Sequence, residues 1–139
     1  ASYVPGLAEK LKESGRLILL DSEEPELEDL KGWISFLYAY GHTPGLMHSI
    51  IQGEKETIFF ASDMVPGTTW INLPIVMGYD RYPEQTVNEK KILMERAVAE
   101  RWLLFYTHDP HTVASRVRLN GKGKYESCEP ITRMEAYNG

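Results

Sequence analysis

The sequence predicts an α+β domain in which a mostly antiparallel sheet carries one long helix. Runs rich in aromatic and β-branched residues recur along the chain, and short turns join several of them. One segment, residues 86–102, has apolar residues at helical spacing over several turns. With 139 residues the chain is long enough to bury one modest core, so we expect a single domain over residues 1–139.

The first part of the chain predicts three short elements. Residues 6–14 follow a proline and have leucines four apart, which indicates a short helix that ends at Gly15. Residues 16–20 (RLILL) are typical of a brief buried strand. Residues 22–29 are acidic and include a proline, so we expect an exposed loop there.

The middle of the chain predicts three strands followed by an irregular segment. Residues 33–40 (WISFLYAY) are aromatic and β-branched, as in a strand. Residues 46–52 and 56–62 flank the polar segment 53–55, which predicts an antiparallel hairpin. Residues 63–82 have no clean periodicity, and we expect them to form loops and turns over a site.

The long helix is expected to begin with a capping box. Thr86 and Glu89 have the spacing at which each side chain accepts a hydrogen bond from a free backbone N–H of the first turn. The apolar stripe that follows is formed by Leu93, Met94, Ala97 and Val98. This stripe predicts which face of the helix packs on the sheet.

The last part of the chain predicts a strand and a hairpin. Residues 102–107 (WLLFYT) are typical of a buried strand. Residues 113–119 and 124–130 flank Asn120-Gly121, a pair that suits the positive φ angles of a tight turn.

Composition excludes several classes of function. The net charge of −5, without a basic surface run, argues against a nucleic-acid partner. No apolar run is long enough for a membrane span, so we expect no membrane partner. Cys128 is the single cysteine, which excludes an intrachain disulfide. The start of the sequence has no signal-like segment, and we expect a cytoplasmic location by default.

Three of the predicted strands end at side chains that suit a metal ion. His42, Asp63 and His108 each come directly after such a strand. Neutral imidazole and carboxylate are suitable ligands for Zn²⁺, Mn²⁺ or Fe²⁺. Taken singly, each residue also fits an ordinary loop or capping role. Because neighbouring strands bring their tips together, we predict that the three side chains converge.

These motifs resemble the carboxy-terminal metal motifs of metallo-β-lactamase-fold hydrolases. The matching segments are GHTPG at residues 41–45, Ser62-Asp63 after an apolar strand, and His108-Asp109 after a later one. The likeness runs from about residue 3 to residue 125 and is closest to lactonase-like and organophosphate-hydrolase-like members. It implies that the chain is the carboxy-terminal half of a four-layer αββα sandwich.

The resemblance also implies a role for each motif residue. His42 would bind a first metal ion and His108 a second. Asp63 would bridge the two ions and would be the catalytic residue. Thr43 would support the imidazole of His42, and Asp109 would either support the site or cap a turn. The cofactors implied are two divalent ions, with Zn²⁺ expected and Mn²⁺ or Fe²⁺ as alternatives.

Two departures from the family pattern limit what this chain can do alone. Leu46 stands where many relatives have a second histidine, and His48 is expected to be an ordinary surface or sheet histidine. The family's upstream H-x-H-x-D-H motif has no counterpart here, since His42 is the first histidine. We therefore expect a fragment with about half of the metal ligands, inactive alone. Such a half would expose an apolar sheet face and would self-associate through it.

The resemblance implies a small-molecule substrate, namely an ester, a lactone or a related compound. Trp70, Met77 and Tyr79, in the segment after Asp63, would line an apolar pocket or would merely pack the loop. Tyr79 or Asp80 could assist protonation of a leaving group. The alternatives are a mononuclear iron dioxygenase of sulfur compounds with the same fold, and a degenerate, non-catalytic binding module.

Overall fold

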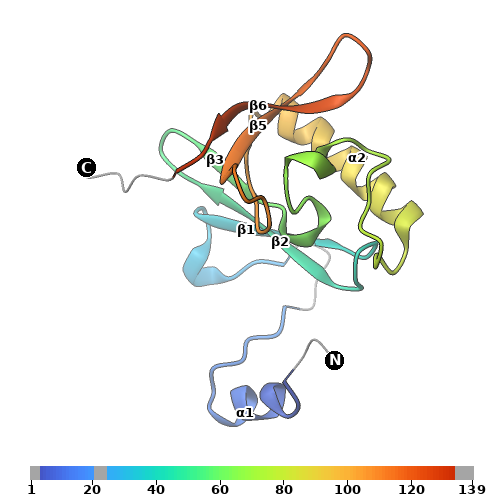
Figure 1. Cartoon of the computed structure of the whole chain (residues 1–139). Coiled ribbons are helices and arrows are strands. Elements are labelled where there is room, and N and C mark those ends of the chain that lie inside the picture. The colour runs from blue at the N-terminus through green and yellow to red at the C-terminus, as the bar shows by residue number, and fades with distance from the viewer. Residues whose placement is uncertain (1–3, 21–24, 134–139) are drawn as a thin grey trace.

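The computed structural model describes residues 4–20 and 25–133. Within these residues a six-stranded sheet carries one long helix, α2 (Pro83–Ala99), and a short helix, α1 (Leu7–Glu13), lies apart from the sheet (Figure 1). The strands follow one another across the sheet in chain order: β1 (Ile34–Ala39), β2 (Leu46–Gln52), β3 (Thr57–Phe60), β4 (Leu103–Phe105), β5 (Ala114–Leu119) and β6 (Tyr125–Ile131). The predicted α+β class is therefore confirmed.

Strand directions decide where the strand ends meet. All neighbouring strands are antiparallel except β3 and β4, which are parallel. A parallel pair needs a long crossover, and the chain between these two strands contains two 3₁₀ turns and α2. Because β1 and β3 are both antiparallel to β2, β1, β3 and β4 all end at the same edge of the sheet.

The core lies between α2 and one face of the sheet. On the helix, Leu93, Met94 and Ala97 are buried and Val98 packs against them, so the predicted apolar stripe is confirmed. On the sheet, the Phe59 ring lies 5.0 Å from the Trp102 ring, measured between centroids. Burial of these apolar surfaces is the main force that holds α2 on the sheet.

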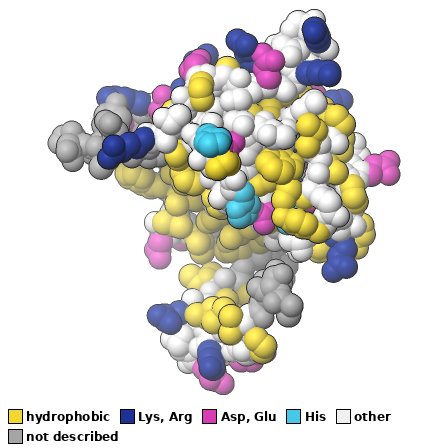
Figure 2. Space-filling view, viewed as in Figure 1, with side chains coloured by type: hydrophobic (Ala, Val, Ile, Leu, Met, Phe, Trp, Pro, Cys, Tyr) yellow, Lys and Arg dark blue, Asp and Glu magenta, His cyan; other side chains and the backbone are white. Residues whose placement is uncertain are grey.

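The opposite face of the sheet is apolar and partly open. We call it the open sheet face, and the strand register assigns to it Ile34, Phe36, Tyr38, Met47, Ile51, Ile58, Phe60 and Phe105. Met47 and Ile51 are 41% and 37% exposed. Figure 2 shows hydrophobic side chains at the surface between the main body and the N-terminal segment.

Residues 16–20 do not form the predicted strand. Ile18 and Leu19 are 66% and 78% exposed, and Leu20 contributes only its carbonyl, which accepts a hydrogen bond from the Tyr38 hydroxyl. A short apolar run becomes a strand only where a neighbouring backbone pairs with it. In the described residues β1 pairs with β2 alone, and no strand covers its other side.

Other predictions for the first part of the chain have mixed outcomes. The predicted helix at residues 6–14 is confirmed as α1, although none of its residues is buried. Residues 21–24 of the predicted acidic loop lie outside the described residues. The rest of that loop forms a 3₁₀ turn at Glu28–Leu30. None of the helices in residues 4–20 and 25–133 is long and apolar enough to cross a membrane.

The predicted capping box at the start of α2 is wrong. The helix begins three residues earlier, at Pro83, whose fixed φ angle suits the first position of a helix. Thr86 lies inside the helix, and its hydroxyl donates back to the Tyr82 carbonyl. The Glu89 carboxylate accepts hydrogen bonds from the backbone N–H groups of Tyr40 and Gly41 and from the Gln85 side chain.

The final hairpin is confirmed, but its turn differs from the prediction. The residue with a positive φ angle is Gly123, at 71°, and not Gly121. The side-chain oxygen of Asn120 accepts hydrogen bonds from the backbone N–H groups of Lys122 and Lys124. A turn of this length places the left-handed residue at its end.

Candidate metal centre

The three predicted metal ligands lie together at the edge where β1, β3 and β4 end. His42 follows β1, Asp63 lies in the 3₁₀ turn Ser62–Met64 after β3, and His108 follows β4. The His108 Nε2 atom is 3.1 Å from Asp63 Oδ1, and the His42 Nε2 atom is 3.6 Å from Asp63 Oδ2. Side chains 21 to 66 residues apart in the sequence therefore converge on one carboxylate.

The arrangement suits a carboxylate that bridges two cations. Each imidazole faces a different oxygen of Asp63, so each oxygen has its own nitrogen ligand nearby. Two imidazoles and a carboxylate form a donor set that fits zinc and related divalent ions. Among the described residues, however, no three His, Cys, Asp or Glu side chains form a group that could hold an ion, and His42, Asp63 and His108 are no exception. The three residues thus have the chemistry of metal ligands without forming a metal-binding group of their own.

The imidazole of His42 is held by a residue that sequence reasoning assigned to another role. Its Nδ1 atom is 2.7 Å from Asp80 Oδ1, and the Asp80 side chain is only 1% exposed. With Nδ1 occupied in this way, the Nε2 atom remains free to face Asp63. Since Asp80 is buried against His42, it is poorly placed to protonate a leaving group.

The turn that carries His42 is fastened to the start of α2. The Glu89 carboxylate accepts hydrogen bonds from the backbone N–H groups of Tyr40 and Gly41, at 2.9 and 3.0 Å. The turn also accepts hydrogen bonds: the N–H of Arg81 donates to the His42 carbonyl, and the N–H of Tyr82 donates to the Gly41 carbonyl. These four backbone groups fix the direction in which the strand end leaves the sheet.

Gly41 is needed because helix α2 lies very close to it. A Cβ atom on Gly41 would lie 2.3 Å from the backbone nitrogen of Thr86 and 2.5 Å from its hydroxyl oxygen. No side chain fits at such a distance, so only glycine permits this approach. Gly45, in the same GHTPG segment, has a φ angle of 78°, in the left-handed region that favours glycine.

Of the two predicted supporting residues, Thr43 makes a different contact from the one expected, and Asp109 takes one of its two expected roles. The Thr43 carbonyl accepts a hydrogen bond from the N–H of Leu46. The residue that supports the His42 imidazole is Asp80. Asp109 accepts hydrogen bonds from the N–H and hydroxyl of Thr68 and from the N–H groups of His111 and Thr112. Asp109 therefore ties two loops together, which is the capping alternative.

The same hydrogen bonds keep Asp109 ionised. Its partial burial would by itself raise the pKa of the carboxyl group. The hydrogen bonds from Thr68, His111 and Thr112 outweigh that effect and lower the pKa to about 2. An ionised Asp109 holds the loop that begins at His108 against the loop that follows Asp63.

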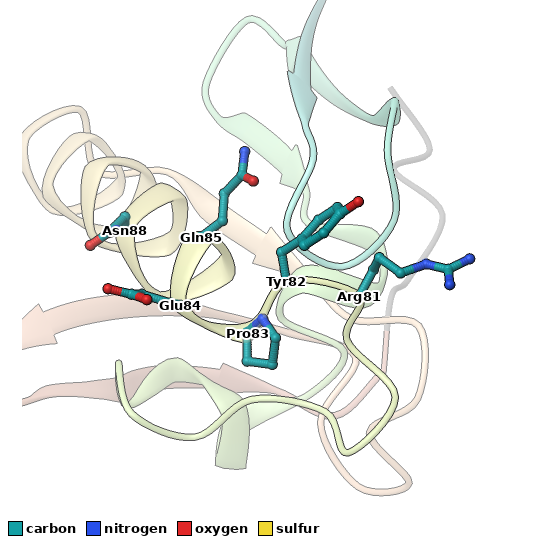
Figure 3. A pocket seen from close by; sticks show the side chains of 6 residues that line it. All are labelled: Arg81, Tyr82, Pro83, Glu84, Gln85 and Asn88. Atoms are coloured by element: carbon teal, nitrogen blue, oxygen red, sulfur yellow. The ribbon is translucent and has the colours of Figure 1, made fainter.

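The predicted pocket residues lie in different environments. Trp70 packs against the core, and Met77 is half-buried. Tyr79 is 69% exposed, and its ring lies edge-on to the His42 ring with centroids 5.8 Å apart. A hollow lies at the start of α2 and is lined by Arg81, Tyr82, Pro83, Glu84, Gln85 and Asn88 (Figure 3).

Sequence reasoning missed the buried Lys90. Its ammonium group donates hydrogen bonds to the carbonyls of Trp70, Asn72 and Ile75, at 3.0, 3.1 and 2.6 Å. Burial lowers the pKa of Lys90 to about 8, although the charge of Asp80 opposes the shift. A signal was present, because Lys90 lies on the same helix face as Met94 and Ala97.

His48 lies in the core and not at the surface, so the surface alternative is wrong. Its ring lies 5.5 Å from that of Phe59, and neither ring nitrogen has a hydrogen-bond partner of good geometry. Burial lowers the pKa of His48 to about 4, and nearby backbone groups of Phe60 and Ala61 offset only part of that shift. His48 is therefore neutral at pH 7.

Comparison with known proteins links this chain to solved structures only. No protein-family model and no curated sequence matches it. A probable metal-dependent hydrolase from Staphylococcus aureus aligns with 85% of this chain at 23% identity and a TM-score of 0.68. AidC, a dizinc quorum-quenching lactonase, aligns with 94% at 19% identity and a TM-score of 0.69. AbOPH, a hydrolase in the beta lactamase superfamily, aligns with 91% at 16% identity and a TM-score of 0.70.

The alignments cover less than half of each solved structure. This chain spans 42%, 44% and 42% of the lengths of the hydrolase from Staphylococcus aureus, AidC and AbOPH. That share agrees with the expected carboxy-terminal half of a larger fold. Sequence identities below 25% establish the fold and leave the activity open. The chain therefore has part of the metallo-β-lactamase fold.

Proposed function

We propose that this chain forms part of a metal-dependent hydrolase that acts on esters, lactones or related small substrates. The observation that carries the proposal is the placement of two imidazoles at the two oxygens of one carboxylate. The similar solved structures support it, since one is a probable metal-dependent hydrolase, one is a dizinc lactonase and one is a hydrolase in the beta lactamase superfamily. Two divalent ions, with Zn²⁺ expected, are the corresponding cofactors.

Each residue of the site has a defined part in this proposal. His42 and His108 would each bind one ion through Nε2, and Asp63 would hold both through its two oxygens. When bound, such ions activate water and polarise the carbonyl or phosphoryl group of a substrate. Tyr79, exposed beside His42, offers an aromatic surface and a phenol to a substrate at this edge of the sheet.

The proposed activity belongs to a larger protein than these 139 residues. The three ligands leave each ion with too few donors for a catalytic zinc site, which has three protein ligands and a water. We propose that residues outside this sequence supply the others, and that the chain alone is inactive. The share of the solved structures that the chain spans supports this division.

Substitution of Asp63 in the full-length protein tests the proposal. Asp63→Asn removes the charge that both ions share, so we expect loss of bound metal and at least a hundredfold lower kcat/KM for aryl esters and lactones. Asp29→Asn, at an exposed position of the 3₁₀ turn Glu28–Leu30, is the matched control. Unchanged metal content by elemental analysis would reject the site, and oxygen consumption would instead favour the iron dioxygenase.

A further inference from the structure

We infer that Asp80 is a positioning residue that holds the His42 imidazole as its Nδ1–H tautomer and leaves Nε2 free to bind a cation. This inference rests on the proposed role of His42 as a metal ligand. It concerns a buried carboxylate for which sequence reasoning suggested only a role toward a leaving group.

The geometry of the contact determines which nitrogen carries the proton. A carboxylate oxygen accepts hydrogen bonds, so the ring nitrogen at 2.7 Å from Asp80 Oδ1 is placed to donate. That nitrogen is Nδ1, and the lone pair of a neutral imidazole then lies on Nε2. Nε2 is also the nitrogen that faces Asp63 Oδ2. A carboxylate behind a metal-binding histidine usually fixes its ring in this way.

Asp80 is itself held from two sides. In the segment that precedes Asp80, three carbonyls from Trp70 to Ile75 accept hydrogen bonds from Lys90. These bonds fasten that segment to α2. On the sequence after it, the N–H of Arg81 donates to the carbonyl of His42. Asp80 therefore contacts His42 through its carboxylate while the next residue contacts His42 through the backbone. Such a double link fixes both the position and the rotation of the imidazole.

The second histidine of the site provides a contrast within the same structure. His108 is 59% exposed in its side chain, and the carboxylate that follows it, Asp109, binds Thr68 and not His108. The His42 side chain is only 10% exposed. The structure therefore holds the His42 imidazole from behind before a cation binds, whereas the exposed His108 imidazole is hydrogen-bonded to Asp63.

A measurement of the tautomer tests the inference without any metal. In the metal-free, ¹⁵N-labelled chain at about pH 8, two-bond ¹H–¹⁵N correlation spectra show which ring nitrogen is protonated. His42→Gln assigns the signal. We expect Nδ1–H in the wild type and a population of the Nε2–H tautomer in Asp80→Ala, with Asp29→Ala unchanged as the control.

The outcomes separate this inference from the proposed function. An Nε2–H tautomer in the wild type, or an unaltered Nδ1–H tautomer in a folded Asp80→Ala, overturns the inference. If Asp80→Ala does not fold, the wild-type spectrum alone still decides. In the full-length protein, Asp80→Ala is expected to weaken Co²⁺ binding about 10- to 100-fold in a spectroscopic titration. Failure of the wild type to bind Co²⁺ would reject the proposed function and leave the tautomer result standing.

Discussion

At the scale of single residues, the buried polar side chains divide into those with partners and one without. Lys90 donates three hydrogen bonds, and the Tyr106 hydroxyl lies 2.6 Å from the hydroxyl of Ser115. His48 has no such partner in the described residues. A buried polar group without a hydrogen bond costs free energy, and protonation would add the cost of a buried charge.

Because His48 is buried in its neutral form, we predict that the folded protein loses stability in mild acid. Because its folded pKa, about 4, is below the ordinary value of 6.5, the unfolded chain takes up the proton first. This contribution to stability is complete above about pH 6.5 and falls as the pH approaches 4. Between pH 7 and pH 5 the loss is about 2 kcal/mol.

Urea unfolding of His48→Leu at pH 7 and pH 5 measures this contribution. The leucine variant is expected to lose about 2 kcal/mol less than the wild type between these two pH values. His111→Gln, at an exposed position, is the control and should behave like the wild type. Equal pH dependence in all three proteins would show that His48 does not titrate as its burial requires.

At the scale of elements, the segment that leads into α2 and the helix itself together hold the turn that carries His42. Asp80, Arg81, Tyr82 and Glu89 all contact the turn at residues 40–42. The strands bring the three ligands to one edge, and the helix sets the direction of one of them. A change in the packing of α2 should therefore affect His42 before it affects His108.

The hydrogen bonds of Lys90 attach α2 to the segment after Asp63, and we predict that this attachment contributes measurably to stability. Lys90→Met keeps the length of the side chain but leaves the carbonyls of Trp70, Asn72 and Ile75 without a buried donor. We expect a destabilisation of about 1–3 kcal/mol. Amide hydrogen exchange should become faster in residues 70–80, since the segment loses its attachment.

A neighbouring lysine gives a matched control for this experiment. Lys91 is on the exposed side of α2 and has only a 4.0 Å ion pair with Glu95. Lys91→Met is expected to change the free energy of unfolding by less than about 0.5 kcal/mol. Equal effects of the two substitutions would indicate that the three carbonyls find other donors.

At the scale of the whole molecule, the open sheet face is the feature most relevant to assembly. Its apolar residues face away from α2, and Met47 and Ile51 are partly exposed. We propose that two copies of this chain associate through this face, since an apolar patch of this kind favours contact with another surface. The double variant Met47→Lys/Ile51→Lys places two charges there and should be monomeric.

Light scattering after size-exclusion chromatography measures the association. The wild type is expected to form a dimer whose fraction rises with protein concentration, whereas the double variant stays a monomer. Ile92→Lys, on the exposed side of α2, controls for a general effect of added charge. A wild type that remains monomeric at millimolar concentration would exclude this use of the face.

Local sequence patterns predicted most of the sheet and part of the site. The hairpin of β2 and β3, the apolar stripe of α2 and the final hairpin are encoded by short-range periodicity and turn residues. Residues 16–20 show the limit of such patterns. They have the composition of a strand, but Ile18 and Leu19 stay exposed because no neighbouring backbone pairs with them.

By itself, the sequence determined that His42, Asp63 and His108 follow strands, because a strand and the residue at its end are neighbours in the chain. Tertiary structure alone decided which side chains support them. Asp80 reaches His42 across 38 residues, and Glu89 reaches Gly41 across 48. Partners so far apart are selected by how α2 packs on the sheet, and no local periodicity records that packing.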